Sequence, residues 1–322
     1  MTEDRPVLVV TEADDLTADM VITELNRRNV PVVRFNPADI GADLTVSARF
    51  STRPAAMTGR VRTPSRSADL TRVRAVYWRR PQWPAFAHLQ PDDARFAATQ
   101  VRFGLGGILY AMDRPLWVNH PLQVAAADYK PAQLALAQSL ALSVPPTLIT
   151  NDPDEAREFI TSTPGDVLFK TLRWTPYTRD GVPVTGWAEP VSAGEIDESI
   201  RVAPHLFQAR VDKMADIRVL VVGRRTFAVR INSTLLDWRR DYSALTYTVE
   251  HIPDRVTTAL HAYLEVQGLV SGSFDLAVDR AGDYWWLELN PNGQWGWLET
   301  ETGLPMSAAF ADLLTEARGE RR

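Results

Sequence analysis

Cysteine is absent from this chain of 322 residues. Its absence excludes a disulfide framework, a thiolate metal site and a catalytic cysteine. The sequence also has no apolar run long enough to cross a bilayer, and its polar first six residues lack the apolar core of a signal peptide. The net charge is only −5, which gives no electrostatic case for nucleic acid or an anionic membrane as a partner. We therefore expect a cytoplasmic protein that binds neither nucleic acid nor membrane.

Glycine is missing at the point where a dinucleotide-binding fold requires it. Residues 7–10 and 31–35 are apolar runs typical of strands. Between them, Asp14 or Asp15 can cap a helix that ends near Arg28. This order indicates a β-α-β unit and hence a parallel sheet. The turn after the first strand reads T-E-A-D-D, so it has no glycine and cannot cradle a pyrophosphate, which excludes a dehydrogenase with the glycine-rich fingerprint.

Two arginines, Arg79 and Arg80, follow a strand predicted at residues 73–78 and stand beside aromatic residues in the string Y-W-R-R-P. Arginines at a strand end can face an acidic ligand. The alternative is a pair of surface side chains on a loop. The local sequence favours this second interpretation.

Two lysines are candidates for contacts with phosphate. The length of the chain favours about two domains or one large α/β unit, with a boundary expected near Asn119. Beyond it, Pro131 fits the first position of a helix, which leaves Lys130 at the helix entry. Lys170 ends a strand predicted at residues 166–170. A lysine supplies a compact positive charge suited to phosphate oxygens, although each of these two taken alone is more typical of a solvated surface.

Segment 273–294 predicts a β-hairpin with an acidic face. Its strand-like runs, S-F-D-L-A-V and Y-W-W-L-E-L-N, flank the polar break D-R-A-G-D. An even-length loop centred between residues 281 and 282 places Asp275 opposite Glu288. Asn290 shares their face because alternate side chains of a strand point the same way. Two carboxylates and an amide oxygen suit a hard cation such as Mg²⁺; the alternative is a half-exposed hairpin with a polar outer face. The apolar face is expected to carry Phe274, Leu276, Val278, Trp285, Leu287 and Leu289.

The order of these features resembles the ATP-grasp fold over residues 119–303. The resemblance rests on Lys130, Lys170, F-Q-A-R-V, D-I-R-V-L-V-V-G, D-W-R-R-D, Asp275 and E-L-N-P-N-G. The strings Y-W-R-R-P, D-W-R and N-P-N-G-Q-W are similar to graspetide synthetases, the ATP-grasp maturases of ribosomal peptides such as the microviridin ligases. The resemblance implies an α/β fold in three parts. These are an N-terminal pre-ATP-grasp domain with a parallel sheet (1–120), a central subdomain with a flap hairpin (121–207) and a C-terminal antiparallel-sheet subdomain with the metal-binding hairpin (208–322).

The resemblance also implies residue roles. Binding of ATP would involve the charged side chains of Lys130, Lys170 and Arg240, the ribose contact of Asp216, and the backbone of Gln208, Ala209 and Arg210 at the adenine. Two Mg²⁺ ions would be held by Asp275, Glu288 and Asn290. Arg218 and Arg239 would stabilise the transferred phosphoryl group, the main catalytic device in phosphoryl transfer. Asp241 departs from the pattern, because several ligases of this fold have an asparagine there and a carboxylate would repel phosphate.

The activity implied is that of an ADP-forming ligase acting on a precursor peptide with a leader and a core. Asp or Glu side chains of the core would be activated as acyl phosphates and joined to Thr or Ser as esters, or to Lys as amides, giving a macrocycle. Two rival functions stay open: a ligase that adds amino acids to a protein or small-molecule acceptor, and a non-catalytic ATP-binding scaffold. The family also suggests a homodimer.

The flap at residues 173–191 is the candidate for leader binding. It carries Trp174, Tyr177 and Trp187 around an Asp-Gly turn. Exposed aromatics beside a sheet edge suit an extended or helical peptide. The alternative is that these aromatics pack the small domain.

Overall fold

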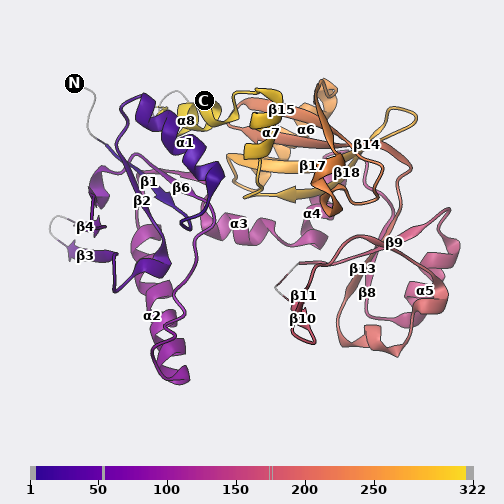
Figure 1. The fold of residues 1–322 in the computed structure, drawn as a ribbon, viewed down its shortest axis with the longest axis horizontal. Coiled ribbons are helices and arrows are strands. Elements are labelled where there is room, and N and C mark those ends of the chain that lie inside the picture. Colours follow the sequence, from indigo (N-terminus) through magenta and orange to yellow (C-terminus); the bar gives the residue numbers. More distant parts are fainter. Residues whose placement is uncertain (1–4, 53–54, 174, 176, 317–322) are drawn as a thin grey trace. The chain divides into compact units, whose positions relative to one another are not determined.

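The structure, a computed structural model, describes residues 5–52, 55–173, 175 and 177–316. The chain forms two compact units (Figure 1). Unit 1 comprises Met1–Val124, Leu269–Ser271 and Asn292–Arg322, and unit 2 comprises Ala125–Gly268 and Gly272–Pro291. The last segment of the chain therefore belongs to the same unit as the first. The three-part division at residues 120 and 207 stays a prediction.

Unit 1 is built on a four-stranded sheet in which all three pairings are parallel. Its order is β2–β1–β6–β7, from β1 (Val7–Val10), β2 (Val32–Phe35), β6 (Ala75–Trp78) and β7 (Leu116–Val118). Strand β1 is followed by α1 (Leu16–Arg27), whose N-cap Asp15 accepts a hydrogen bond from the backbone N–H of Ala18. The predicted β-α-β unit is confirmed. Because the chain moves outward in opposite directions from β1 and from β6, the strand order reverses between these two strands.

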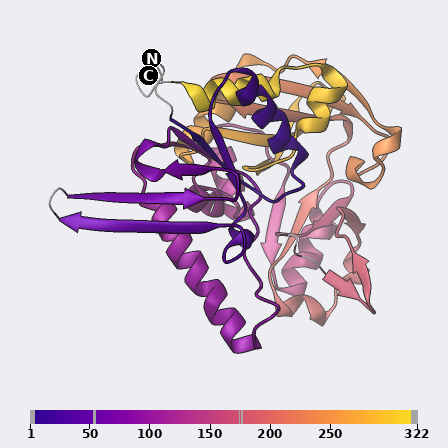
Figure 2. The ribbon, with the colours of Figure 1, turned by 60° about the vertical axis from the view of Figure 1, so that its left-hand side comes forward.

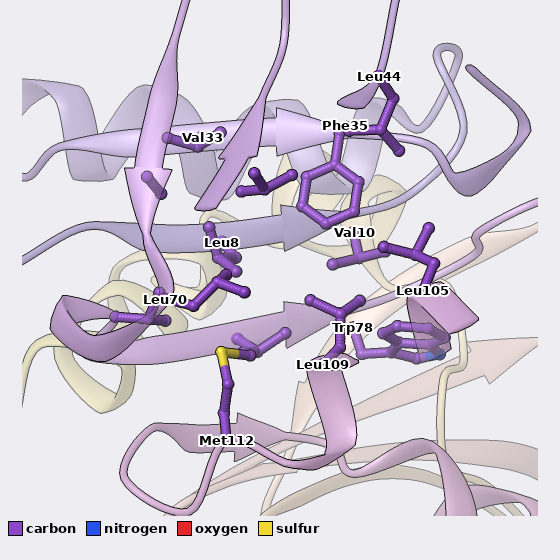
Figure 3. Packing of buried hydrophobic residues seen from close by; sticks show 14 residues of the cluster. Leu8, Val10, Val33, Phe35, Leu44, Leu70, Trp78, Leu105, Leu109 and Met112 are labelled. Carbon is purple, nitrogen blue, oxygen red and sulfur yellow. The ribbon is translucent and has the colours of Figure 1, made fainter. Parts of the chain in front are cut away.

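Both faces of this sheet are covered. On one face, Leu8 and Val10 pack with Leu105 and Leu109 of α2 (Pro91–Tyr110), as Figure 3 shows. On the other face, Tyr77 contacts the ring of Phe310 in α8 (Met306–Thr315). The remaining elements of the unit are the antiparallel sheet β3 (Thr45–Thr52), β4 (Ala55–Arg62) and β5 (Ser67–Asp69), which projects in Figure 2, and α7 (Gly296–Thr302). The chain leaves the unit within α3 (Pro121–Ala127).

Unit 2 contains two larger sheets. The four-stranded one has the order β12–β9–β13–β8, from β8 (Thr147–Thr150), β9 (Val167–Lys170), β12 (Glu189–Val191) and β13 (His205–Ala209). Ala156 of α5 (Pro153–Ser162) packs with Val167 and Phe207 in its core. The flap is a separate hairpin of β10 (Tyr177–Arg179) and β11 (Val182–Val184), with Asp180 and Gly181 both at positive φ, as the predicted turn requires.

The five-stranded sheet of unit 2 has the order β16–β15–β14–β17–β18. Its strands are β14 (Lys213–Val222), β15 (Arg225–Asn232), β16 (Thr246–Glu250), β17 (Ser271–Asp279) and β18 (Tyr284–Asn290). Tyr263 of α6 (Asp254–Val266) stacks on Trp286 and meets Phe274 edge-on. Gln133 of α4 (Lys130–Ser139) accepts from the N–H of Leu289 and donates to its carbonyl. None of the helices formed by the described residues is long and apolar enough to cross a membrane.

The acidic hairpin forms as predicted, but the strand pairing near its turn differs from the expected one. Asp275 does lie opposite Glu288. Nearer the turn, however, Leu276 pairs with Trp286 and Val278 with Tyr284, because a β-bulge at Leu287 compensates for a loop of odd length. Trp286 is therefore the buried residue, whereas the expected positions of Trp285 and Leu287 on the apolar face are wrong.

Candidate functional site

A pocket in unit 2 brings together most of the residues singled out in the sequence. Its walls come from the start of α4, the ends of β9 and β13, and the strands β14, β17 and β18. Nine predicted site residues line it: Lys130, Lys170, Gln208, Ala209, Arg210, Asp216, Arg239, Asp275 and Glu288. Three others, Arg218, Arg240 and Asn290, are outside its lining. Helix α4 begins at Lys130, so Pro131 occupies the second helical position and not the expected first.

Glu288 is surrounded by positive charge. Its carboxylate lies 3.0 Å from Nζ of Lys130 and 3.6 Å from Nη2 of Arg239. Burial raises the pKa of Glu288, but the charges of Lys130 and Arg239 outweigh it and hold the pKa well below its usual range. The carboxylate is therefore ionised at neutral pH.

Asp275, the cross-strand partner of Glu288, is neutralised separately. Nη1 of Arg218 donates to both of its carboxylate oxygens, at 2.7 and 2.8 Å, and both side chains are buried. Facing carboxylates would destabilise the hairpin if they were left uncompensated. Here Arg218 compensates one of them, while Lys130 and Arg239 compensate the other.

Lys170 lies at the end of β9, with Nζ donating to Oε1 of Gln208 at 2.5 Å. Burial lowers the pKa of Lys170 to about 8; Glu288 opposes this shift, and the positive charge of Lys130 adds to it. Among the described residues, the ammonium group donates to a neutral acceptor, and the positive charges of Lys130, Lys213 and Arg239 lower its pKa further. An anionic ligand in the pocket would relieve this repulsion.

The sequence interpretation missed Lys213, which lines the pocket beside Asp216. Its Nζ donates to both oxygens of Asp216, at 2.7 and 2.6 Å, and to the carbonyl of Leu236. Burial raises the pKa of Asp216, and the charge of Lys213 opposes that shift. A spacing of three residues within a strand places side chains on opposite faces, so strand periodicity gave no signal for this pair.

Asp237, a second missed residue, precedes Arg239 and holds it. Its Oδ1 accepts from the backbone N–H of Arg239 and lies 3.2 Å from Nε of the same residue. Burial alone would lower the pKa of Arg239, but Asp275 and Glu288 raise it above its ordinary value. Arg239 is therefore a permanently charged group facing an acidic pair.

The two residues after Arg239 point elsewhere. Arg240 donates to Glu189 at 2.6 Å and lies 5.9 Å from the ring centre of Trp187. The carboxylate of Asp241 accepts from the N–H and the hydroxyl of Ser243, which lowers its pKa. Asp241 thus caps its own turn.

The oxygen set of the hairpin fits a magnesium ion. Asp275 and Glu288 share a cross-strand pair, and Asn290 follows two residues later, opposite Ser273 at the exposed end of β18. The His, Cys, Asp and Glu side chains of the described residues form no group of three placed to hold a metal. The set therefore depends on the amide oxygen of Asn290 and on ligand oxygens, as is usual for Mg²⁺ bound with phosphates.

The flap residues have different surroundings. Trp174 lies outside the described residues. Tyr177 is 52% exposed and is paired with Val184, while Trp187 lines the pocket. The two-stranded sheet has an exposed apolar face formed by Tyr177, Val182 and Val184. An isolated two-stranded hairpin is only marginally stable in water. A leader-binding role for this flap stays a prediction.

Arg79 contradicts the interpretation of a surface pair. It is buried, and it contacts Asp15 and the loop that follows β18, whereas only Arg80 is exposed. Local sequence could not show this, because Asp15 lies 64 positions away and the acceptors at residues 292–294 lie more than two hundred positions away.

No protein-family model matches the chain, and a search of curated proteins finds no match. Solved structures do match. A RiPP-associated ATP-grasp ligase of Chryseobacterium gregarium, in complex with ADP and a leader and core peptide, has a TM-score of 0.88 and 25% identity over 96% of each chain. The macrocyclase MdnB of Microcystis aeruginosa has a TM-score of 0.83 and 27% identity over 97% of this chain and 100% of its own. The macrocyclase MdnC of the same organism, bound with precursor peptide MdnA, has a TM-score of 0.87 at 22% identity, over 97% of this chain and 100% of its own.

These likenesses confirm the α/β ATP-grasp fold predicted from the sequence. The resemblance to ATP-grasp ligases of ribosomally synthesised and modified peptides is likewise confirmed, since the similarity covers nearly the whole of both chains. At 22% identity, MdnC supports the fold alone.

Proposed function

We propose that this protein is an ATP-dependent, ADP-forming ligase that modifies a ribosomally made precursor peptide. The observation that carries the proposal is the pocket of unit 2. There, the positive side chains of Lys130, Lys170 and Arg239 lie around the carboxylates of the hairpin formed by β17 and β18. Two similar structures support it, because one is described as an ATP-grasp ligase bound to ADP with a leader and core peptide and the other as a macrocyclase.

The residues would divide the work by charge. Lys130 and Lys170 would bind the ATP phosphates, and the backbone of Gln208, Ala209 and Arg210 would bind the adenine. Asp216, released in part from Lys213, would accept from the ribose hydroxyls. Asp275, Glu288 and Asn290 would hold Mg²⁺, which when bound neutralises the phosphate charge. Arg218, Arg240 and Asn290 are outside the pocket lining, so their implied roles require a rearrangement on binding.

The chemistry would proceed in two steps. An Asp or Glu carboxylate oxygen of the core peptide attacks the γ-phosphorus of ATP, the bond to the bridging oxygen breaks, and ADP leaves. A Thr or Ser hydroxyl, or a Lys amine, then attacks the acyl carbon, the bond to the phosphate oxygen breaks, and the phosphate carries away the proton. Arg239, fixed by Asp237 beside the acidic pair, would stabilise the charge that develops on the transferred group.

A second candidate function is a ligase whose acceptor is a small molecule or a protein and not a precursor peptide. D-cycloserine synthetase DcsG, a small-molecule enzyme by name, has a TM-score of 0.60 at 16% identity over 96% of this chain and 98% of its own. The same pocket could therefore serve a ligase that adds amino acids to a small molecule or protein. A scaffold that binds ATP without catalysis is disfavoured by the ionised Glu288 with its three neighbouring cations.

Mass spectrometry of a candidate precursor tests the proposal. A short peptide rich in Asp or Glu and in Thr, Ser or Lys, encoded beside this protein, would be incubated with the protein, ATP and Mg²⁺. We expect losses of one or more water masses that depend on ATP, and fragmentation would separate esters from amides. A mass gain equal to an amino-acid residue would favour the alternative ligase, and ATP binding with no change in any peptide would favour the scaffold.

A further inference from the structure

Arg79 lies at the carboxyl end of β6, at the edge of the parallel sheet of unit 1 where the strand order reverses. It is 4% exposed and directly follows β6, while Thr11 and Asp15 follow β1. The strand order reverses between β1 and β6, and open α/β sheets bind their ligands at this point, outside the carboxyl ends of the strands. In this protein the position is filled by the chain itself, at residues 292–294.

Arg79 uses all three of its nitrogens there. Nε donates to Oδ2 of Asp15 at 3.3 Å. Nη1 donates to the carbonyls of Asn292 and Gly293 at 3.4 and 3.3 Å, and Nη2 donates to Oε1 of Gln294 at 2.9 Å. The rigid fork of an arginine suits several fixed acceptors, which a single ammonium group cannot match.

The surroundings hold both ends of this arrangement in place. Oδ2 of Asp15 also accepts from the hydroxyl of Thr11 at 2.7 Å, and the hydroxyl of Thr17 donates to Oε1 of Gln294. Just beyond, at the start of α7, a Cβ on Gly296 would lie 2.9 Å from Oγ1 of Thr17, so a larger residue would force the Thr17 side chain or the backbone to shift. The loop is thus bound to α1 and to the end of β6 by polar contacts that leave little freedom.

The held segment begins two residues after Asn290, with Pro291 between them. The proline fixes one of the two soft torsions of that link. An anchor on residues 292–294 therefore restricts the end of β18, which carries Glu288 and Asn290. The lysines proposed for the phosphates lie on other elements, α4 and β9, and do not depend on this loop.

We propose that Arg79 is a positioning residue that fixes the end of β18 for binding of the metal–nucleotide complex. This inference rests on the proposed function. In it, the place outside the carboxyl ends of β1 and β6, where open α/β sheets bind ligands, is taken by the contact of Arg79 with residues 292–294. Partners that orient metal ligands typically alter metal affinity by about 10–100-fold when removed.

The test compares Arg79→Met with Arg28→Met. Arg28 is a half-buried arginine of the same unit that also binds the C-terminal segment, through Asp312 of α8, but it does not touch residues 292–294. ADP affinity would be measured by calorimetry with and without Mg²⁺. The ratio of ADP affinity with Mg²⁺ to ADP affinity without Mg²⁺ should be about tenfold smaller in Arg79→Met than in the wild type. The affinity for ADP alone should be unchanged. Arg28→Met should keep the full effect of Mg²⁺ even if its melting temperature falls equally.

Hydrogen exchange without nucleotide provides the second readout. Amides of residues 292–296 should exchange faster in Arg79→Met than in the wild type or in Arg28→Met. Should Arg79→Met fail to fold, Gln294→Ala removes a single acceptor and should shift both readouts in the same direction by less. An unchanged effect of Mg²⁺ in the folded variant would overturn the positioning role, and unchanged exchange would overturn the anchor. A wild type that binds no ADP at all would instead overturn the proposed function, and exchange would still decide whether Arg79 anchors the loop.

Discussion

Each unit places an arginine beside carboxylates, and the two arrangements differ in what satisfies the charge. In unit 1, the side chain of Arg79 is 3% exposed, and one carboxylate and three neutral acceptors of its own chain accept from it. In unit 2, the side chain of Arg239 is 45% exposed and lies at 3.2 and 3.6 Å from the carboxylates of Asp237 and Glu288. A buried arginine whose three nitrogens all donate to acceptors of its own chain indicates a structural anchor. A half-exposed arginine that shares a pocket with several charged groups indicates a site that awaits a ligand.

The largest effect should come from breaking the buried pair of Arg218 and Asp275. Asp275→Ala leaves Arg218 buried without its bidentate partner, so we expect a loss of about 3–5 kcal/mol in the free energy of unfolding, along with loss of activity. Urea unfolding measures the first quantity. The double substitution Asp275→Leu with Arg218→Met should recover most of the stability but none of the activity. A single variant as stable as the wild type would show that the pair is not closed in solution.

Glu288→Gln should separate activity from stability. It preserves shape but removes the charge that the three cations face, so we expect ATP-dependent peptide modification to fall about a hundredfold. The melting temperature should change little, because Lys130 and Arg239 are partly exposed. Glu250→Gln is the matched control, since Glu250 pairs with Arg230 away from the pocket lining. Near-normal turnover in Glu288→Gln would make the metal assignment wrong.

The lowered pKa of Lys170 predicts a pH-dependent affinity for ATP. Only the protonated lysine attracts phosphate, so affinity should be strongest below a pH of about 8 and should weaken as the pH rises through that value. Lys170→Arg should flatten the profile because arginine stays charged, whereas Lys170→Met should show weak binding at every pH, by about tenfold. Calorimetry between pH 6.5 and 9, values chosen to bracket a pKa of about 8, checks this. A wild-type affinity that does not vary with pH would contradict it.

The smallest effect is expected at Arg240. Its bond to Glu189 joins two exposed side chains, and such surface pairs contribute about 0–1 kcal/mol. Arg240→Gln should therefore change ATP affinity by less than about fivefold. A larger loss would mean that Arg240 turns into the pocket on binding, as the family resemblance implies.

The sequence predicted the fold and much of the pocket because strand and helix periods are local. Alternation in β17 and β18 was enough to place Asp275 opposite Glu288. The bulge at Leu287 could not be predicted in this way. The loop has an odd number of residues, and one extra residue in β18 is needed to bring Glu288 opposite Asp275. The outcome for the carboxylates was right although the expected loop length was wrong.

Two contacts of charged residues could not be predicted from local patterns. The burial of Arg79 depends on acceptors contributed by residues 292–294, more than two hundred positions away, so it emerges only when the fold is known. Lys213 lies only three residues before Asp216, but strand periodicity places the two side chains on opposite faces and therefore did not indicate their contact.

The division of the chain also determines when each unit can be completed during synthesis. Unit 1 includes the segment that begins at Asn292, in which Trp295 stacks on Phe310, whereas all residues of unit 2 precede Asn292. On the ribosome, unit 2 can therefore fold before unit 1 has its full core, and the first strands of the chain must wait for the last helix. Such long-range closure is slow and leaves apolar strands exposed meanwhile. A C-terminal truncation should accordingly destabilise the N-terminal sheet and leave the pocket unit folded.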